Sequence, residues 1–173
     1  MDSIVVGFSK PKTWKPFSWL IMTGYGIPYD HVYIKFHSDS FDRDIIYQAS
    51  ELMVNFMGKQ FTDANTIVDE FEVEITPENK LALIQFAIDN AGKPYGIMEA
   101  FGLAIVRIAE LFGKKINNPF SNNGSTYVCS VLVGYILAQY AGIDVPDQTD
   151  NITPKEVYDY LMLIKAKKIQ STR

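Results

Sequence analysis

Cysteine and histidine are scarce in this chain of 173 residues, which contains one cysteine and two histidines. A single cysteine excludes an internal disulfide, and with only two histidines a zinc site built from thiolates and imidazoles is not expected. The sequence therefore predicts no metal and no other cofactor. The one cysteine, Cys129, follows a loop rich in Asn, Ser and Gly at 114–126 and begins an apolar stretch that continues to Ile143.

A basic surplus is also missing. Lys and Arg number 16 against 20 for Asp and Glu, so the formal net charge is −4. Proteins that bind nucleic acid usually carry a positive surplus, and we expect no nucleic-acid partner. A basic tail at the C-terminus, formed by Lys165, Lys167, Lys168 and Arg173, is expected to be solvated.

The sequence has no apolar run of the length that a membrane span requires. The most apolar segments are 97–106, which contains Glu99, and 127–143, which is shorter than the ~20 residues needed. The first ten residues do not have the pattern of a secretory signal. We therefore expect no integral membrane segment. The chain is predicted to be cytoplasmic, or delivered without an N-terminal signal, as a phage-encoded protein can be.

The order of hydrophobic patterns predicts an α+β fold in one domain that covers residues 1–173. Strands are predicted at 3–8, 31–36, 44–50, 51–56 and 66–75. Helices are predicted at 17–24, ending at Gly24, at 77–91, at 97–112, from Cys129 to just before Gly142, and after a capping box at 153–156. Thr76 and Pro77 provide a cap and a first residue for the helix at 77–91.

The strand predicted at 31–36 has two different faces. Val32, Ile34 and Phe36 point one way, whereas His31, Tyr33 and Lys35 point the other. His31 thus opens a strand, on its more polar face. The other histidine, His37, precedes the hairpin sequence SDSFDR and is expected to lie at the surface.

These residues could form a thiol-based catalytic site. A cysteine nucleophile needs a favoured thiolate, a base within hydrogen-bond reach and a group that orients the base. The start of a helix favours a thiolate at Cys129 because unpaired N–H groups gather there. His31 is the candidate base, and Gln48 is the candidate orienting group, with Glu51 and Asn55 as rivals.

Four segments, in this order, resemble the permuted NlpC/P60 proteins, the papain-like YaeF/YiiX group. SWLIMTGYGIPYDHVYIKF (18–36) resembles S-x-L-I…T-G…P-Y-S-H-V-x-I, and IYQAS (46–50) resembles Y-E-A-S. GKPYG (92–96) resembles G-x-P-Y-D, and YVCSVLVGYIL (127–137) resembles Y-x-C-S-E-L-V. Permuted members carry histidine, polar residue and cysteine in that order, as this chain does. The resemblance implies a papain-like fold with an antiparallel sheet of about five strands packed by helices.

The resemblance also implies roles for individual residues. Cys129 would be the nucleophile, His31 the base and Gln48 the third polar residue. Tyr29, which precedes the histidine in the motif, would line the site and help bind an oxyanion together with the Cys129 backbone N–H. Two departures from the family pattern matter, because relatives often have Glu where Gln48 stands and Glu where Val131 stands.

The function that the resemblance implies is hydrolysis of an amide, through an acyl-thioenzyme, in a cell-wall peptide. Two alternatives remain open. Relatives also act on lipid acyl groups, so the chain could be a thiol acyltransferase or a lipid esterase. It could also be a catalytically silent binding or structural module, for instance of a phage particle, and the Glu-to-Gln departure favours this. The expected partner is accordingly a peptide or acyl substrate.

Overall fold

Six strands form one antiparallel sheet in the order β4-β3-β2-β1-β5-β6. The structure, a computed structural model, describes residues 2–50, 52–96, 102, 105–106, 109, 112–114, 116–117, 119, 128–143, 145 and 152–169. The strands are β1 (Asp2–Pro11), β2 (His31–Ser38), β3 (Arg43–Ala49), β4 (Val54–Met57), β5 (Asn65–Ile75) and β6 (Lys167–Ile169). The named helices are α1 (Pro16–Tyr25), α2 (Lys59–Ala64), α3 (Pro77–Asn90), α5 (Cys129–Tyr140) and α6 (Pro154–Leu163).

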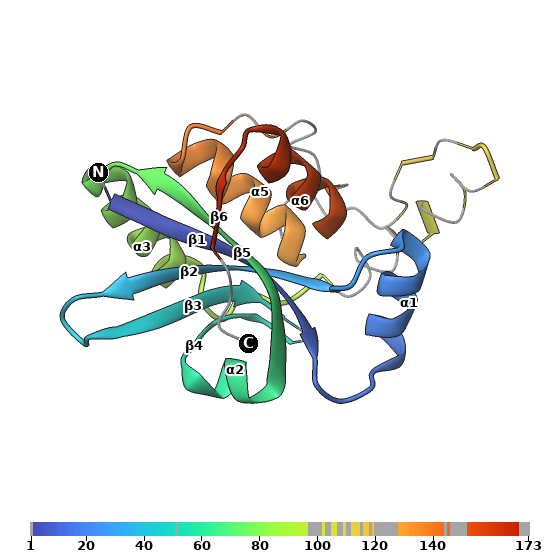
Figure 1. Cartoon of the computed structure of the whole chain (residues 1–173), viewed down its shortest axis with the longest axis horizontal. Helices are drawn as coiled ribbons and strands as arrows, with labels where there is room; N and C mark the ends of the chain where they lie inside the picture. Colours follow the sequence, from blue (N-terminus) through green and yellow to red (C-terminus); the bar gives the residue numbers. More distant parts are fainter. Residues whose placement is uncertain are drawn as a thin grey trace.

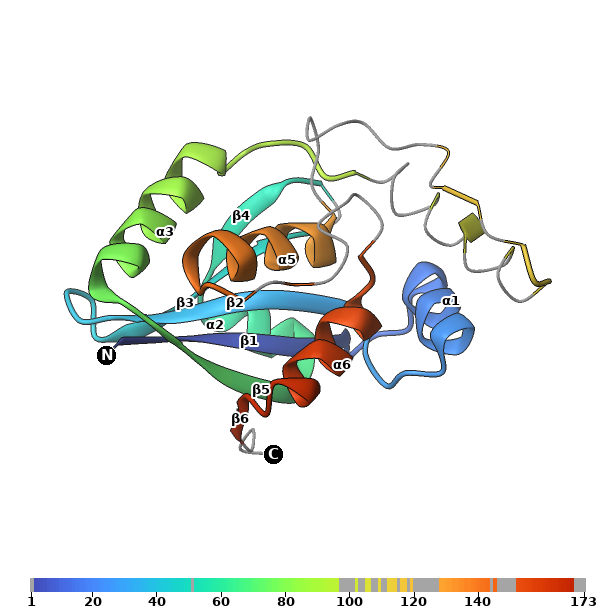
Figure 2. The same cartoon turned by 90° about the horizontal axis from the view of Figure 1, so that it is seen from above.

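The helices are divided between the two faces of the sheet. Figure 1 shows α3, α5 and α6 on one side and α2 on the other. In the view from above, α5 lies over β2 and β3, and α1 stands beyond the end of the sheet (Figure 2). The fold is therefore α+β, with a main layer of helices on one face and a short helix on the other.

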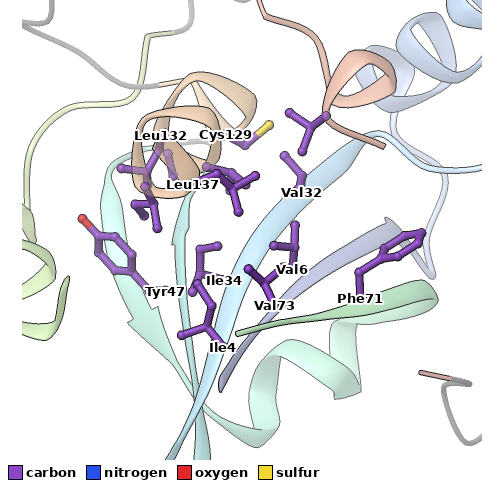
Figure 3. Packing of buried hydrophobic residues seen from close by; sticks show 14 of the residues in the cluster. Ile4, Val6, Val32, Ile34, Tyr47, Phe71, Val73, Cys129, Leu132 and Leu137 are labelled. Carbon is purple, nitrogen blue, oxygen red and sulfur yellow. The ribbon is translucent and has the colours of Figure 1, made fainter. Parts of the chain in front are cut away.

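The main hydrophobic core lies between the sheet and the larger helix layer. Ile4, Val6, Val32, Ile34 and Val73 point from the sheet toward Leu132 and Leu137 of α5 (Figure 3). A second, smaller cluster on the other face consists of Tyr33, Ile46 and Phe61, the last from α2. Burial of apolar surface on both faces, at roughly 25 cal/mol per Å², holds the two helix layers on the sheet.

The alternation predicted for β2 is confirmed. Val32, Ile34 and Phe36 belong to the main core, whereas Tyr33 belongs to the cluster under α2. Side chains of a strand alternate between faces, so His31 shares the α2 face with Tyr33, and its ring lies near those of Tyr33 and Phe61.

Both predicted helix caps are also confirmed. The Thr76 side chain accepts a hydrogen bond from the backbone N–H of Asn79, with Pro77 in the first turn of α3. Thr153 and Glu156 form the capping box of α6. Helices α3 and α6 therefore begin at residues whose side chains accept hydrogen bonds from N–H groups in the first turn of the helix.

Several details differ from the expectations. The sheet has six strands instead of about five, because the three-residue β6 was not predicted. The six-residue α2 was not predicted either. The helix predicted to end at Gly24 continues to Tyr25, and Gly26 takes the left-handed cap position with φ 64°. Elements this short bury too few side chains to leave a clear period in the sequence.

Other predicted segments lie largely outside the described residues. Within the helix predicted at 97–112, residues 102, 105–106 and 109 are described and are helical. Most of the loop predicted at 114–126 lies outside the described residues as well. Among the helices that the structure describes, none is both long and apolar enough to cross a membrane.

Candidate functional site

His31 and Gln48 meet on the face of the sheet that α2 covers. His31 is the first residue of β2, and Gln48 is near the end of the neighbouring strand β3. The described pairing of the two strands runs from Ser38↔Arg43 to Ile34↔Tyr47 and ends before His31 is reached. Beyond it the side chains make the connection, with 2.7 Å between His31 Nε2 and Gln48 Oε1.

The neighbours of Gln48 fix the direction of this hydrogen bond. Its Nε2 donates to Asn55 Oδ1 at 3.2 Å and to Met57 Sδ at 2.9 Å, and both partners are acceptors. The amide oxygen therefore faces the imidazole and accepts a hydrogen bond from the N–H at His31 Nε2. In the neutral ring the other nitrogen, Nδ1, is then the basic one, which is the tautomer that a general base requires.

The ring of His31 rests on an ordered polar and aromatic platform. It stacks on Tyr33 with 6.5 Å between ring centroids and an interplanar angle of 23°. The Tyr33 hydroxyl donates to Glu70 Oε1 at 2.8 Å, and Lys35 Nζ lies 2.7 Å from both oxygens of the same carboxylate. These hydrogen bonds satisfy the polar groups beneath the ring, so the imidazole has a fixed support.

Gly7 of β1 makes room for this platform. It pairs with Tyr33 across the sheet, and a Cβ atom at Gly7 would lie far inside van der Waals contact with the Tyr33 ring and hydroxyl. The absence of a side chain at Gly7 is what lets the tyrosine ring cross the strand to reach Glu70.

Cys129 is the first residue of α5 and is buried, with 4% of its surface exposed. The backbone amides of Val32 and Ser130 and the side chain of Tyr95 act on its thiol as hydrogen-bond partners that lower its pKa. Figure 3 shows the sulfur at the end of α5, directed away from Leu132 and toward the side where Val32 lies. The thiol is thus held against the start of β2.

The net effect on the thiol is opposite to the one predicted. Burial and, less strongly, the nearby charge of Asp30 outweigh the hydrogen bonds and raise the pKa of Cys129 to about 11. The expectation of a favoured thiolate at a helix start is therefore wrong for this structure. A thiolate at this position would lose more stabilisation from water than the two backbone amides and the Tyr95 hydroxyl provide. The thiol therefore stays protonated near neutral pH.

The structure thus brings Gln48 to His31 and brings Cys129 to the backbone beside His31. The amide of Val32, which contacts the thiol, belongs to the residue that follows the histidine. Strand alternation sends the Val32 side chain into the main core and the His31 ring to the α2 face.

Tyr29 lies elsewhere in the core, with 3% of its surface exposed. Its ring stacks on Tyr158 of α6 with a centroid distance of 5.3 Å. Burial, together with the charges of Asp159 and Asp69, raises the pKa of its hydroxyl. The oxyanion role of Tyr29 stays a prediction, while the hydroxyl that contacts the thiol is that of Tyr95.

Two residues near the thiol were not assigned a role from the sequence. Tyr95 is the tyrosine of the motif GKPYG. The sequence thus singles out this segment, but it does not indicate that the tyrosine contacts Cys129. Asp30 occupies the position where the pattern P-Y-S-H-V has Ser. That difference is the feature of the sequence that could have drawn attention to Asp30. One carboxylate oxygen of Asp30, Oδ1, is buried without a hydrogen-bond partner in the structure.

The rival residues fall into different places. Asn55 bonds to Gln48 and donates to Ser50 Oγ, so it supports the amide of Gln48. Glu51 lies outside the described residues. His37 is at the surface as predicted, with half of its side chain exposed beside Asp44. Across the part of the chain that is described, no cluster of three or more metal-ligating side chains occurs.

Comparison with known proteins adds no assignment, because no protein-family model and no curated protein matches the chain.

Proposed function

We propose that the chain is a cysteine-dependent hydrolase of the permuted NlpC/P60, papain-like type, with Cys129 as nucleophile, His31 as base and Gln48 as orienting group. The observation that carries the proposal is the 2.7 Å contact between His31 Nε2 and Gln48 Oε1. A glutamine buried to 3% exposure, with its amide nitrogen already bonded, serves to hold an imidazole in one tautomer.

The raised pKa of the thiol determines the order of events. Because Cys129 is neutral at rest, the proposal has its proton leave as the sulfur attacks and His31 Nδ1 accept it, which requires the imidazole to approach the thiol around the end of β2. The S–C bond forms while the carbonyl π electrons move to oxygen, and the Cys129 backbone N–H stabilises that oxyanion. Collapse breaks the C–N bond, and the leaving amine takes the proton from His31. Water, deprotonated by His31, then cleaves the thioester and restores the thiol.

The proposed substrate is an amide bond in a cell-wall peptide. A groove of about 970 Å³ on the α2 face reaches Met57, which contacts Gln48, but neither Cys129 nor His31 lines it. Charged side chains of both signs line it, among them Lys35, Arg43 and Asp44. The choice of a peptide substrate therefore rests on the family resemblance, and the acyltransferase and esterase alternative stays open.

The test is the release of peptides from purified cell-wall fragments, followed by chromatography and mass spectrometry. Wild-type protein should produce new amine termini, and Cys129→Ala should produce none. His31→Ala should lose most activity, whereas its matched control, His37→Ala, should keep it. Release of fatty acid from phospholipid in place of peptide cleavage would identify the lipid-directed alternative. If neither wild-type protein nor Cys129→Ala releases product from either substrate, the chain is a non-catalytic module, and equal release by both would contradict the role of Cys129.

A further inference from the structure

The segment that leads into the candidate site exposes a set of large apolar side chains. Trp14 and Trp19 are 74% and 53% exposed, and Phe17 and Leu20 are 39% and 41% exposed. Three of these residues belong to α1 and one to the loop before it. We call these four residues the α1 patch. Large apolar side chains gathered at the surface in this way commonly mark a contact with a partner or a membrane.

The helix itself has no charged residue and little contact with the fold. Its sequence is PFSWLIMTGY, and Ser18 is its one buried residue. Ser18, Met22 and Tyr25 share one side of the helix, so Trp19 and Leu20 point away from it. Figures 1 and 2 both show α1 beyond the end of the sheet, away from α3 and α5. A water-exposed helix face made of Trp, Leu and Thr, without a charge, lacks the polar surface that such faces normally carry.

The charges along the chain segment that carries the patch have one sign. Between Asp2 and Asp30 the chain has no acidic residue but three lysines, at positions 10, 12 and 15, although its formal net charge is −4. Two of them, Lys10 and Lys12, lie at the end of β1 and just after it, on the segment that leads into the patch. Positive charge beside exposed tryptophans is complementary to an anionic lipid surface, where Trp rings settle at the headgroup level.

We infer that the α1 patch docks on the surface of an anionic phospholipid bilayer, with α1 lying in the plane of the interface. A helix of ten residues extends over about 15 Å and cannot cross the ~30 Å hydrocarbon core, so it lies on the membrane. Gly26–Asp30 joins the end of α1 directly to His31, and docking would therefore hold the candidate site next to the membrane. The inference does not depend on catalysis by Cys129.

The test uses a property of this chain, whose two tryptophans both belong to the patch. Tryptophan emission is followed while vesicles of phosphatidylglycerol and phosphatidylcholine, or of phosphatidylcholine alone, are added to the wild-type protein. The expected result is a saturable blue shift with the anionic vesicles and quenching by lipids that carry nitroxide near the headgroup. No shift with either vesicle would overturn the proposal, and this arm requires no variant.

Two pairs of variants separate docking from general attraction. Leu20→Asp should weaken binding at least ~10-fold, while Leu81→Asp, at an exposed leucine of α3, should leave it unchanged. The double change Lys10→Gln and Lys12→Gln should cost roughly fivefold per lysine, and the same change at Lys167 and Lys168 should have little effect. Equal losses in the members of either pair would refute docking through the patch. A blue shift that grows with protein concentration in the absence of lipid, together with dimer sedimentation, would show that a second copy covers the patch and would also refute it.

Discussion

Raising the pH should bring Cys129 into reaction with iodoacetamide only well above the range in which ordinary cysteines react. The reason is burial, which leaves 4% of the residue exposed and raises the pKa of its thiol to about 11. At pH ~7.5 a thiol with that pKa is thiolate in about 3 molecules per 10,000, against about one in ten for an ordinary cysteine. On thiolate fraction alone, alkylation at that pH should thus be roughly 300-fold slower than for a free thiol.

The rate of alkylation is measured by mass spectrometry of the intact protein across a pH series in which circular dichroism shows the fold to be unchanged. Because the chain has one cysteine, every added carbamidomethyl group reports on Cys129. The rate should climb about tenfold per pH unit up to about pH 11. A plateau that begins below about pH 8.5, or a rate at neutral pH equal to that of glutathione, would refute the reasoning about burial.

A variant identifies the second cause of the raised pKa. Asp30→Asn removes a negative charge that opposes the thiolate, so it should lower the pKa of Cys129 and speed alkylation at a fixed pH. Asp44→Asn removes an aspartate from the exposed part of β3 and serves as the matched control. Equal alkylation rates in the two variants would show that Asp30 does not act on the thiol.

Two further substitutions test the support of His31. Gly7→Ala should displace Tyr33 and lower the free energy of unfolding in urea by about 1–3 kcal/mol. Gly24→Ala is the control and should not be destabilising, because a Cβ atom there would meet open space. Similar losses of stability in both variants would contradict the packing described. Gln48→Glu should keep the hydrogen bond to His31 and shift the pH–rate profile for peptide release to higher pH, because an added carboxylate favours the imidazolium. An unchanged profile would mean that residue 48 does not orient the base.

The sequence predicts much of this fold because its signals are local. The alternation in β2, the cap at Thr76 and the capping box at Thr153 each depend on a few neighbouring residues, and all three are confirmed. The two missed elements, α2 and β6, are held by contacts with distant parts of the chain. Phe61 of α2 packs under Tyr33, and Lys167 of β6 bonds to Glu72 of β5.

The candidate site is predictable in its residue types and less so in its electrostatics. The pairing of His31 with Gln48 follows from their neighbouring strands, which the sequence indicates. The raised pKa of Cys129 depends instead on how completely α5 and the sheet exclude water, and no spacing in the sequence records that. Tyr29 illustrates the same limit, because its ring is held by Tyr158, which is more than a hundred residues away in the chain.

The central claim, that Cys129 forms an acyl-thioenzyme with the help of His31, is tested most directly by trapping the acyl group. The protein is mixed with p-nitrophenyl acetate near neutral pH, quenched in acid and digested, and the peptide that contains Cys129 is examined by mass spectrometry. We expect an acetyl adduct on Cys129 in wild-type protein and in His37→Ala, and its formation should be strongly slowed in His31→Ala. Absence of the adduct from wild-type protein, or its formation at the same rate in His31→Ala, would contradict the account.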